Sequence, residues 1–393
     1  MERYGPEQGR RRCSGAAAGL TLPRVLDAYL GVVRRDRTVL VRRRDFLLGT
    51  LGAALAGTNV RGDDLHWHDV HMHVVGGRDE SFGEAVDGAI AAMDQFGIAK
   101  AVIFPPPTPR AGIFDYTDYV PELRRHPGRF GFLAGGGTLN PMLQQTQPAD
   151  VTPAIKQNWT DTANRMLDAG AAGFGEIAVL HLSLVPNHPF EETEADHPLL
   201  LLLVEVADQR KAVIDLHMDP VSDGSMGLPT SLKAPPNPKQ LKGNVAALER
   251  LLAHGPDARI VWAHGGSDFT GNMTPHLIGA LMERHSNLYM SLRPIPALAA
   301  ANNPFGLQFQ NLLLTPEGID SNWLALLQKH SDRFVMGGDT FFVSSSVNTE
   351  RAAVALSRGN EPRLRAARVA LERMPPDLAK KIGLTNAQRL YKI

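Results

Sequence analysis

The chain has 393 residues, of which 43% are hydrophobic and 21% charged, a composition typical of a soluble globular protein and not of a disordered or fibrous one. Its 41 lysines and arginines balance its 41 aspartates and glutamates, so the overall charge gives no reason to expect nucleic acid or an acidic membrane surface as a partner. The single cysteine, Cys13, excludes an intrachain disulfide and a thiolate metal site, so any metal must be held by histidine, aspartate or glutamate.

The N-terminal residues 1–56 have the pattern of a leader that is not part of the fold. In RRRDFLLGTLGAALAG, residues 42–57, the arginine pair Arg43 and Arg44 precedes a short apolar stretch and an A-x-A sequence that ends at Ala56. The apolar stretch has about 10 residues, against the roughly 20 that span a bilayer. The segment resembles a twin-arginine signal peptide, which implies cleavage after Ala56. An ordinary amphipathic helix or a retained anchor is the alternative.

This resemblance implies recognition by the twin-arginine export machinery and a mature protein that is periplasmic or extracellular. Residues 1–40 are long for the charged region of such a signal, and translation from Val39 or Val41 would leave them untranslated. We expect residues 57–393 to form one domain with no stable membrane insertion.

Eight short runs rich in β-branched and aromatic residues follow, separated by segments in which apolar residues recur at helical spacing. The runs are 67–74, 100–105, 129–135, 171–177, 212–219, 259–266, 287–292 and 333–339. Strand and helix in alternation eight times predict a parallel (β/α)8 TIM barrel of the α/β class. A doubly wound open sheet has the same alternation and is the alternative.

Six side chains of the metal-ligand type occur at the C-terminal ends of these runs, namely His71, His73, Glu176, His217, His264 and Asp339. The C-terminal ends of barrel strands meet at one mouth, where TIM barrels carry their chemistry, so we expect the six to converge. His71 and His73 are two residues apart and both point into the barrel. Two unpaired imidazoles there would be costly, and this ligand set suits Zn²⁺, with Mn²⁺ or Fe²⁺ as alternatives.

The motifs at these positions carry a family resemblance. They are HMH at 71–73, GFGEI at 173–177, DLHMD at 215–219, VWAHGG at 261–266 and MGGD at 336–339, and they resemble the metal-dependent amidohydrolase superfamily. The closing LTNAQRLY, residues 384–391, is similar to the final helix of its amidohydrolase-2 (amidohydrolase-related) family. The fourth strand carries Glu176 and no lysine, so a carboxylated-lysine bridge between two metals is excluded.

The resemblance implies an enzyme with one or two divalent metal ions, and Glu176 decides between two arrangements. If Glu176 bridges, one metal takes His71, His73 and Asp339, and a second takes His217 and His264. The protein is then a hydrolase that cleaves an amide, ester or lactone of a small molecule by a metal-bound hydroxide. Asp339 would orient the hydroxide and pass its proton to the leaving group. We favour this arrangement.

In the second arrangement a single metal takes His71, His73, His217 and Asp339, while His264 is free to act as an acid, a base or an electrophile. Glu176 then only accepts hydrogen bonds around the metal, and decarboxylation of a small aromatic acid becomes the expected reaction. A third class, an exported metal-binding barrel without turnover, would keep the ligands but need no substrate pocket.

Four further polar residues lie near the predicted site. Arg293, at the end of the seventh strand, is predicted to bind a substrate carboxylate, with an ion pair that holds its loop as the alternative. Asp219 is positioned to orient the ring of His217. His181 is interpreted as a solvated surface histidine, and His68 as structural.

Overall fold

The computed structural model describes residues 66–76, 82–112, 114–184, 188–222, 224–295, 306–345 and 359–393. The predicted leader, residues 1–56, lies outside these ranges. None of the helices within the described ranges has both the length and the apolar character needed to cross a membrane.

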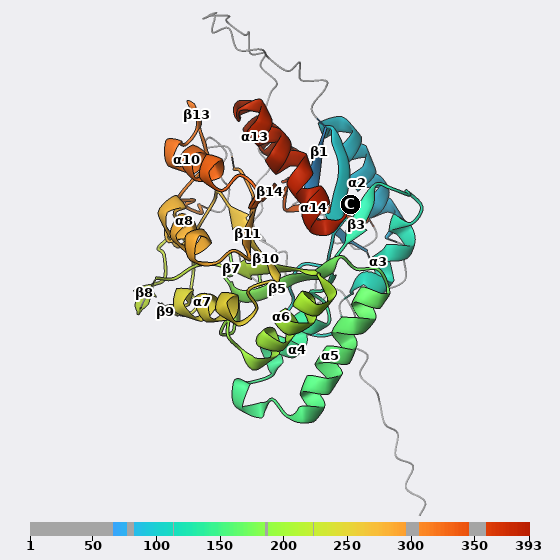
Figure 1. The fold of residues 1–393 in the computed structure, drawn as a ribbon, viewed down its shortest axis with the longest axis vertical. Coiled ribbons are helices and arrows are strands. Elements are labelled where there is room, and N and C mark those ends of the chain that lie inside the picture. The colour runs from blue at the N-terminus through green and yellow to red at the C-terminus, as the bar shows by residue number, and fades with distance from the viewer. Residues whose placement is uncertain are drawn as a thin grey trace, which may run out of the picture.

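The strands confirm the predicted barrel (Figure 1). Each predicted run forms a strand, and the strands are β1 (Trp67–Val75), β2 (Ile98–Ile103), β3 (Phe130–Phe132) with β4 (Ala134–Gly135), β5 (Gly173–His181), β7 (Val213–Met218), β10 (Arg259–Gly265), β11 (Leu288–Leu292), and β14 (Phe334–Met336) with β15 (Thr340–Val343). Strand β5 extends four residues beyond the predicted run. All pairings between neighbouring strands of this ring are parallel.

Two interrupted strands close the ring. In the third, β3 pairs with β2 and β4 pairs with β5; in the eighth, β14 pairs with β11 and β15 pairs with β1. The backbone continues to bond across the second interruption, because Gly337 N donates to Leu292 O at 2.9 Å and Asp339 N donates to His71 O at 2.8 Å. The order of the strands is therefore that of a closed (β/α)8 barrel and not of a doubly wound open sheet.

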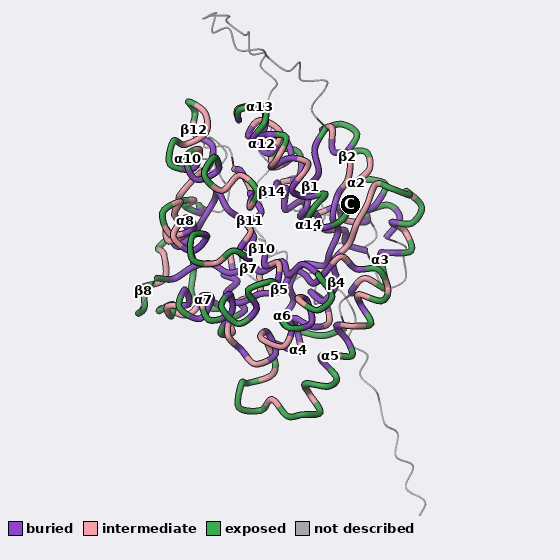
Figure 2. Tube along the Cα trace, viewed as in Figure 1, coloured by how far each residue is buried: buried purple, intermediate pink, exposed green. Residues whose placement is uncertain are grey.

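Helices surround the strands, with their exposed faces outward (Figures 1 and 2). They are α2 (Gly83–Phe96), α3 (Tyr116–Leu123), α4 (Leu139–Gln145), α5 (Pro153–Asp168), α6 (Pro198–Arg210), α7 (Val245–His254), α8 (Pro275–Arg284), α10 (Ser321–Lys329), α12 (Asn360–Arg373), α13 (Pro376–Lys380) and α14 (Asn386–Tyr391). Their ends follow local chemistry: Thr274 accepts the Leu277 N–H at the start of α8, and Gly97, with φ at 71°, ends α2.

Several short elements lie outside the barrel strands and the main helices. The 3₁₀ turn η1 (Pro148–Asp150) precedes α5, and the π-helical turn η2 (Lys381–Thr385) joins α13 to α14. Antiparallel pairs form between β8 (Ser225–Gly227) and β9 (Gln240–Lys242) and between β12 (Leu314–Thr315) and β13 (Gly318–Ile319). Strand β6 (Glu191–Glu192) pairs antiparallel with the end of β5.

The N-terminal half of the barrel is filled by apolar side chains. A buried cluster inside the ring takes a valine from each of five strands, Phe104 and Leu133 from just beyond β2 and β3, and three residues from α14, namely Val70, Val102, Phe104, Leu133, Val213, Val261, Val335, Ala387, Leu390 and Tyr391. Helix α14 therefore closes this end, which we call the base. A second, larger cluster packs the outer faces of the strands against the helices.

Three strands lose their regular register at the other end of the barrel, the mouth. The pairing shifts by one residue between Asp69 and Met72 on β1, between Phe174 and Ile177 on β5, and between Trp262 and Gly265 on β10. Such bulges re-aim side chains and often lie beside active sites. Each of these bulges contains one of the predicted ligands.

Candidate metal centre

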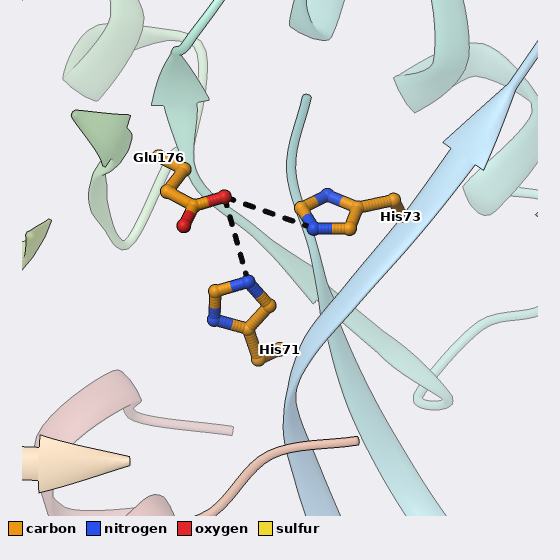
Figure 3. Close-up of side chains that lie close together, drawn as sticks. All are labelled: His71, His73 and Glu176. Atoms are coloured by element: carbon orange, nitrogen blue, oxygen red, sulfur yellow. Dashed lines mark ion pairs between the residues drawn. The ribbon is translucent and has the colours of Figure 1, made fainter. Parts of the chain in front are cut away.

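The two histidines of β1 point into the mouth, and their rings are fixed from behind. His73 Nδ1 lies 2.8 Å from the carbonyl oxygen of Phe104, so Nδ1 carries the proton and Nε2 is left as the electron-pair donor. His71 Nδ1 lies 3.7 Å from Asp215 Oδ1. Both Nε2 atoms are buried without a hydrogen-bond partner among the described residues, and both face Glu176 (Figure 3).

Glu176 stands between two pairs of histidines. Its Oε2 lies 3.6 Å from His71 Nε2 and 3.8 Å from His73 Nε2. Its Oε1 lies 2.6 Å from His217 Nδ1 and 3.0 Å from His264 Nε2. Each carboxylate oxygen therefore serves one pair, which is the arrangement that a bridging carboxylate needs.

Asp339 completes the ring of polar groups from the interruption in the eighth strand. Its Oδ1 lies 3.6 Å from His73 Nε2 and 3.9 Å from His71 Nε2. Its Oδ2 accepts from Arg293 at 2.8 Å, and its backbone oxygen accepts from the half-buried Arg363. Arg293 thus forms the ion pair that was the alternative to substrate binding, and it turns Oδ1 toward the histidines.

Two of these residues have a backbone conformation that residues other than glycine rarely adopt. His264 has φ at 71° and Asp339 has φ at 50°, both in the left-handed region that usually costs a residue with a Cβ atom about 1 kcal/mol or more. Strain of this kind is retained where the surrounding structure demands a particular side-chain direction. Here both side chains are directed at the same cluster.

The charges of the cluster are balanced by protons on histidine. Burial alone would lower the pKa of His71, but the carboxylates of Asp215 and Glu176 outweigh it and raise that pKa well above its ordinary value. Burial is likewise outweighed at His217, where Glu176 and Asp219 raise the pKa to about 10. Although burial opposes it, His71 and His217 hold the pKa of Glu176 well below its usual range.

The same residues fit a divalent cation. Ligand atoms of three sets lie within 4.8 Å of one another in each set: His71, His73 and Glu176; His71, His264 and Asp339; Glu176, His217 and His264. A cation would supply the positive charge that protons supply here, and it would use the buried Nε2 atoms that otherwise find no partner. All six ligands predicted from the sequence are thus brought together.

Two buried aspartates belong to this centre and were not predicted. Asp215 precedes His217 by two residues on β7, so both face inward, and Asp215 contacts His71. Asp69 Oδ1 accepts from His71 N at 3.0 Å and from Gly338 N at 2.9 Å, which ties β1 to the segment that carries Asp339. The alternation of DLHMD could have revealed Asp215, and the same spacing in DVHMH could have pointed to Asp69, but not to its partner Gly338.

The predictions for Asp219 and His181 have different outcomes. Asp219 Oδ2 lies 3.7 Å from His217 Nε2, as expected for a residue that orients the ring. The interpretation of His181 as a surface residue was wrong: it is only 7% exposed, and its ring centroid lies 4.6 Å from that of His217. The reason is that β5 continues to His181 and is covered there by β6.

Comparisons of the fold with solved structures give distant likenesses. The chain is similar to an uncharacterized TIM-barrel protein from Bordetella bronchiseptica, with 16% identity, 78% of this chain and 82% of that chain covered, and a TM-score of 0.44. It is similar to 5-carboxyvanillate decarboxylase from Novosphingobium aromaticivorans, solved with manganese and 4-hydroxy-3-methoxy-5-nitrobenzoic acid, with 13% identity, 84% and 97% covered, and a TM-score of 0.44.

It is also similar to amidohydrolase 2 from Bifidobacterium longum subsp. infantis, with 11% identity, 84% and 99% covered, and a TM-score of 0.42. No protein-family model and no curated protein matches the chain. Because these identities and TM-scores are low, the reaction has to be argued from the centre itself.

Proposed function

We propose that the chain is a metal-dependent hydrolase in which Glu176 bridges two divalent cations and which cleaves an amide, ester or lactone of a small molecule. The observation that carries the proposal is the division of the Glu176 carboxylate between two histidine pairs, with Oε2 toward His71 and His73 and Oε1 toward His217 and His264. A carboxylate that only accepted hydrogen bonds around one metal would have no need to face both pairs.

In this assignment His71, His73 and Asp339 would hold one cation, and His217 and His264 would hold the other. Zn²⁺ suits this set of imidazole and carboxylate ligands, with Mn²⁺ or Fe²⁺ as alternatives. When bound, the metal supplies Lewis-acid activation of water and of the substrate carbonyl.

The chain's own groups then manage protons and orientation. Although burial opposes it, Arg363, His73 and Arg293 hold the pKa of Asp339 well below its usual range, so its carboxylate is ionised. Its Oδ1 would accept the proton of the attacking water and deliver it to the leaving group. Burial and Arg293 hold the pKa of His264 well below its ordinary value, so this ring is neutral and offers an electron pair.

A second candidate, a decarboxylase with one metal, is favoured by a different observation. Asp339 Oδ1 lies 3.9 Å from His71 Nε2 and 3.6 Å from His73 Nε2, so these three residues with His217 could hold a single ion and leave His264 free. The 2.6 Å contact between Glu176 Oε1 and His217 Nδ1 would then be an ordinary hydrogen bond that orients a ligand.

A substrate panel separates these functions. The full chain, loaded with Zn²⁺ or Mn²⁺, would be assayed against aryl esters, lactones and amides, and against hydroxybenzoates with detection of released carbon dioxide. The proposal predicts hydrolysis that is lost in Asp339→Asn, with the folded Lys392→Gln variant as a surface control. Carbon dioxide release without hydrolysis would establish the second candidate, and binding without turnover would indicate a metal-binding barrel.

We also propose export by the twin-arginine machinery to the periplasm or the extracellular space. The support is the sequence of residues 42–57, with Arg43 and Arg44 ahead of a short apolar stretch. Replacing both arginines by lysine should retain the protein, uncleaved, in the cytoplasmic fraction of a bacterial host that has this machinery. Equal export of the parent and the variant would contradict the proposal.

A further inference from the structure

Two arginines approach Asp339 from different elements, and the structure uses them differently. Arg293 follows β11, and Arg363 lies on α12. Arg293 Nη1 donates to Asp339 Oδ2 at 2.8 Å, and Arg293 Nε donates to Ser267 Oγ at 3.2 Å. Since Arg293 is occupied by partners within the protein, it is a poor candidate for a substrate-binding residue, and Arg363 has to be considered in its place.

The guanidinium of Arg363 has hydrogen-bond donors to spare. It carries five N–H groups, and within the described ranges its one hydrogen bond runs from Nη1 to the carbonyl oxygen of Asp339. That oxygen is neutral, and no carboxylate in the same ranges forms an ion pair with this side chain. A half-buried charge without a partner of opposite sign is costly to keep. Arg363 is therefore suited to an anion that the protein itself does not provide.

Arg363 lies at the mouth of the barrel, close to the metal ligands. The carbonyl oxygen that it contacts belongs to Asp339, whose Oδ1 lies 3.6 Å from His73 Nε2. Arg363 Cζ lies 6.0 Å from the centroid of the Phe341 ring, and that centroid lies 4.5 Å from the centroid of the His73 ring. The guanidinium is thus separated from the centre by one residue along the chain and by one aromatic ring in space, so a small molecule could contact both.

We propose that Arg363 binds a carboxylate of the substrate and so selects substrates that carry an acidic group a short distance from the bond that is cleaved. A guanidinium presents parallel N–H groups that fit the two oxygens of a carboxylate, and partial burial strengthens such a contact. The role predicted for Arg293 from the sequence thus passes to Arg363, which acts as a specificity-determining residue.

This contact narrows the class of substrate. It rests on the proposed function, in which an amide, ester or lactone is cleaved at the metal centre. The substrate would be such a compound with a free carboxylate, for example a half-ester or half-amide of a small dicarboxylic acid. Water replaces the alcohol or amine on the acyl carbon, so the product is a dicarboxylate with one end at the metal centre and the other at Arg363.

A binding experiment tests the contact without turnover. The full chain, loaded with Zn²⁺, would be titrated by calorimetry with succinate, glutarate and phthalate, each paired with its monoamide. The two members of a pair offer the same carboxylate to the metal and differ in the charge at the other end. We expect the parent to bind at least one dicarboxylate about 10-fold or more tightly than its monoamide, and Arg363→Gln to bind the two about equally.

Matched variants separate this contact from other effects of charge. Arg365 lies on the same helix, is exposed and pairs with Glu361 at 2.6 Å, so Arg365→Gln should keep the preference of the parent for the dicarboxylate. Arg363→Lys keeps the charge but not the forked donors, so the preference should fall without vanishing. If Arg363→Gln does not fold, Arg363→Lys decides, and a preference equal to that of the parent contradicts the proposal.

Three results would overturn the proposal. The parent could bind every dicarboxylate no more tightly than its monoamide, or Arg363→Gln could keep the preference of the parent. The variant could also lose affinity for both members of a pair equally, together with bound metal, which would mean that Arg363 only supports Asp339.

The failure of this proposal and the failure of the proposed function are distinguishable. If no compound is hydrolysed, the binding result still stands or falls by itself, because it needs no turnover. If neutral esters are hydrolysed as fast as their carboxylated counterparts, the selectivity is contradicted while the hydrolase function remains.

Discussion

The two ends of the barrel differ in their side chains and in the regularity of their strands. At the base, the strands contribute valines such as Val213, Val261 and Val335 to an apolar layer that α14 covers. At the mouth, three strands bulge, the eighth is interrupted, and His264 and Asp339 have positive φ values. The difference teaches that packing energy is concentrated at one end, while the other end holds polar side chains at some cost to regular structure.

The largest expected effects separate the two ends. His73→Ala removes a ligand at the mouth, and we expect metal affinity to fall by more than the 10–100-fold that loss of a supporting residue costs, with stability nearly unchanged in the metal-free protein. Leu390→Ala, at the base, removes a buried side chain of α14 and should reduce the free energy of unfolding by about 2–5 kcal/mol while metal affinity is retained. Denaturant unfolding and metal titration check both.

The distinction between the mouth and the base would be contradicted if His73→Ala and Leu390→Ala each lowered both the metal affinity and the free energy of unfolding. That result would mean that the mouth and the base form a single cooperative unit in which the metal holds the fold.

Much of this architecture could be predicted from the sequence because regular alternation is local. The β-rich runs and the i, i+2 spacing of His71 and His73 gave the barrel and the inward direction of both rings. The bulges could not be predicted from the sequence, because each depends on how a strand pairs with its neighbour. Asp69 illustrates the limit: its partner Gly338 lies 269 positions further along the chain.

The prediction that His181 lies on the surface was wrong for a related reason. The alternation of the fourth run ends near residue 177, but β5 pairs further with β7 and with β6, and the register shifts again between Ala178 and Leu180. A bulge changes which side of the strand a residue faces, so the spacing from Glu176 no longer indicates the direction of His181.

A smaller effect is expected from the support of the ligands. Asp215 contacts His71 Nδ1, and its replacement by asparagine keeps the shape but removes the charge that favours this ring orientation. We expect Asp215→Asn to lower metal affinity by about 10–100-fold and to leave the thermal unfolding of the metal-free protein similar to that of the parent. An unchanged affinity would show that Asp215 has no influence on the mouth.

The smallest effect concerns pH at the base. Burial, with help from Lys100, lowers the pKa of His68 from 6.5 to about 4, so the folded protein favours neutral His68. A depressed pKa of this kind contributes stability that is present above pH 6.5 and is lost as the pH falls through about 4.

His68→Phe should therefore lose less stability than the parent between pH 7 and pH 4.5. Chemical denaturation at the two pH values measures this, with the exposed His66→Phe as the control. Parallel losses in the parent and in His68→Phe would show that acid acts elsewhere, in particular on the histidines of the mouth.

The bridging role of Glu176 is tested most directly by counting metal ions. The full chain and its Glu176→Ala variant would be purified without chelators, and bound metal per protomer would be measured by elemental mass spectrometry. The account predicts about two ions in the parent and one or fewer in the variant. One ion in both proteins would contradict the bridge and make decarboxylation at a single metal the leading function.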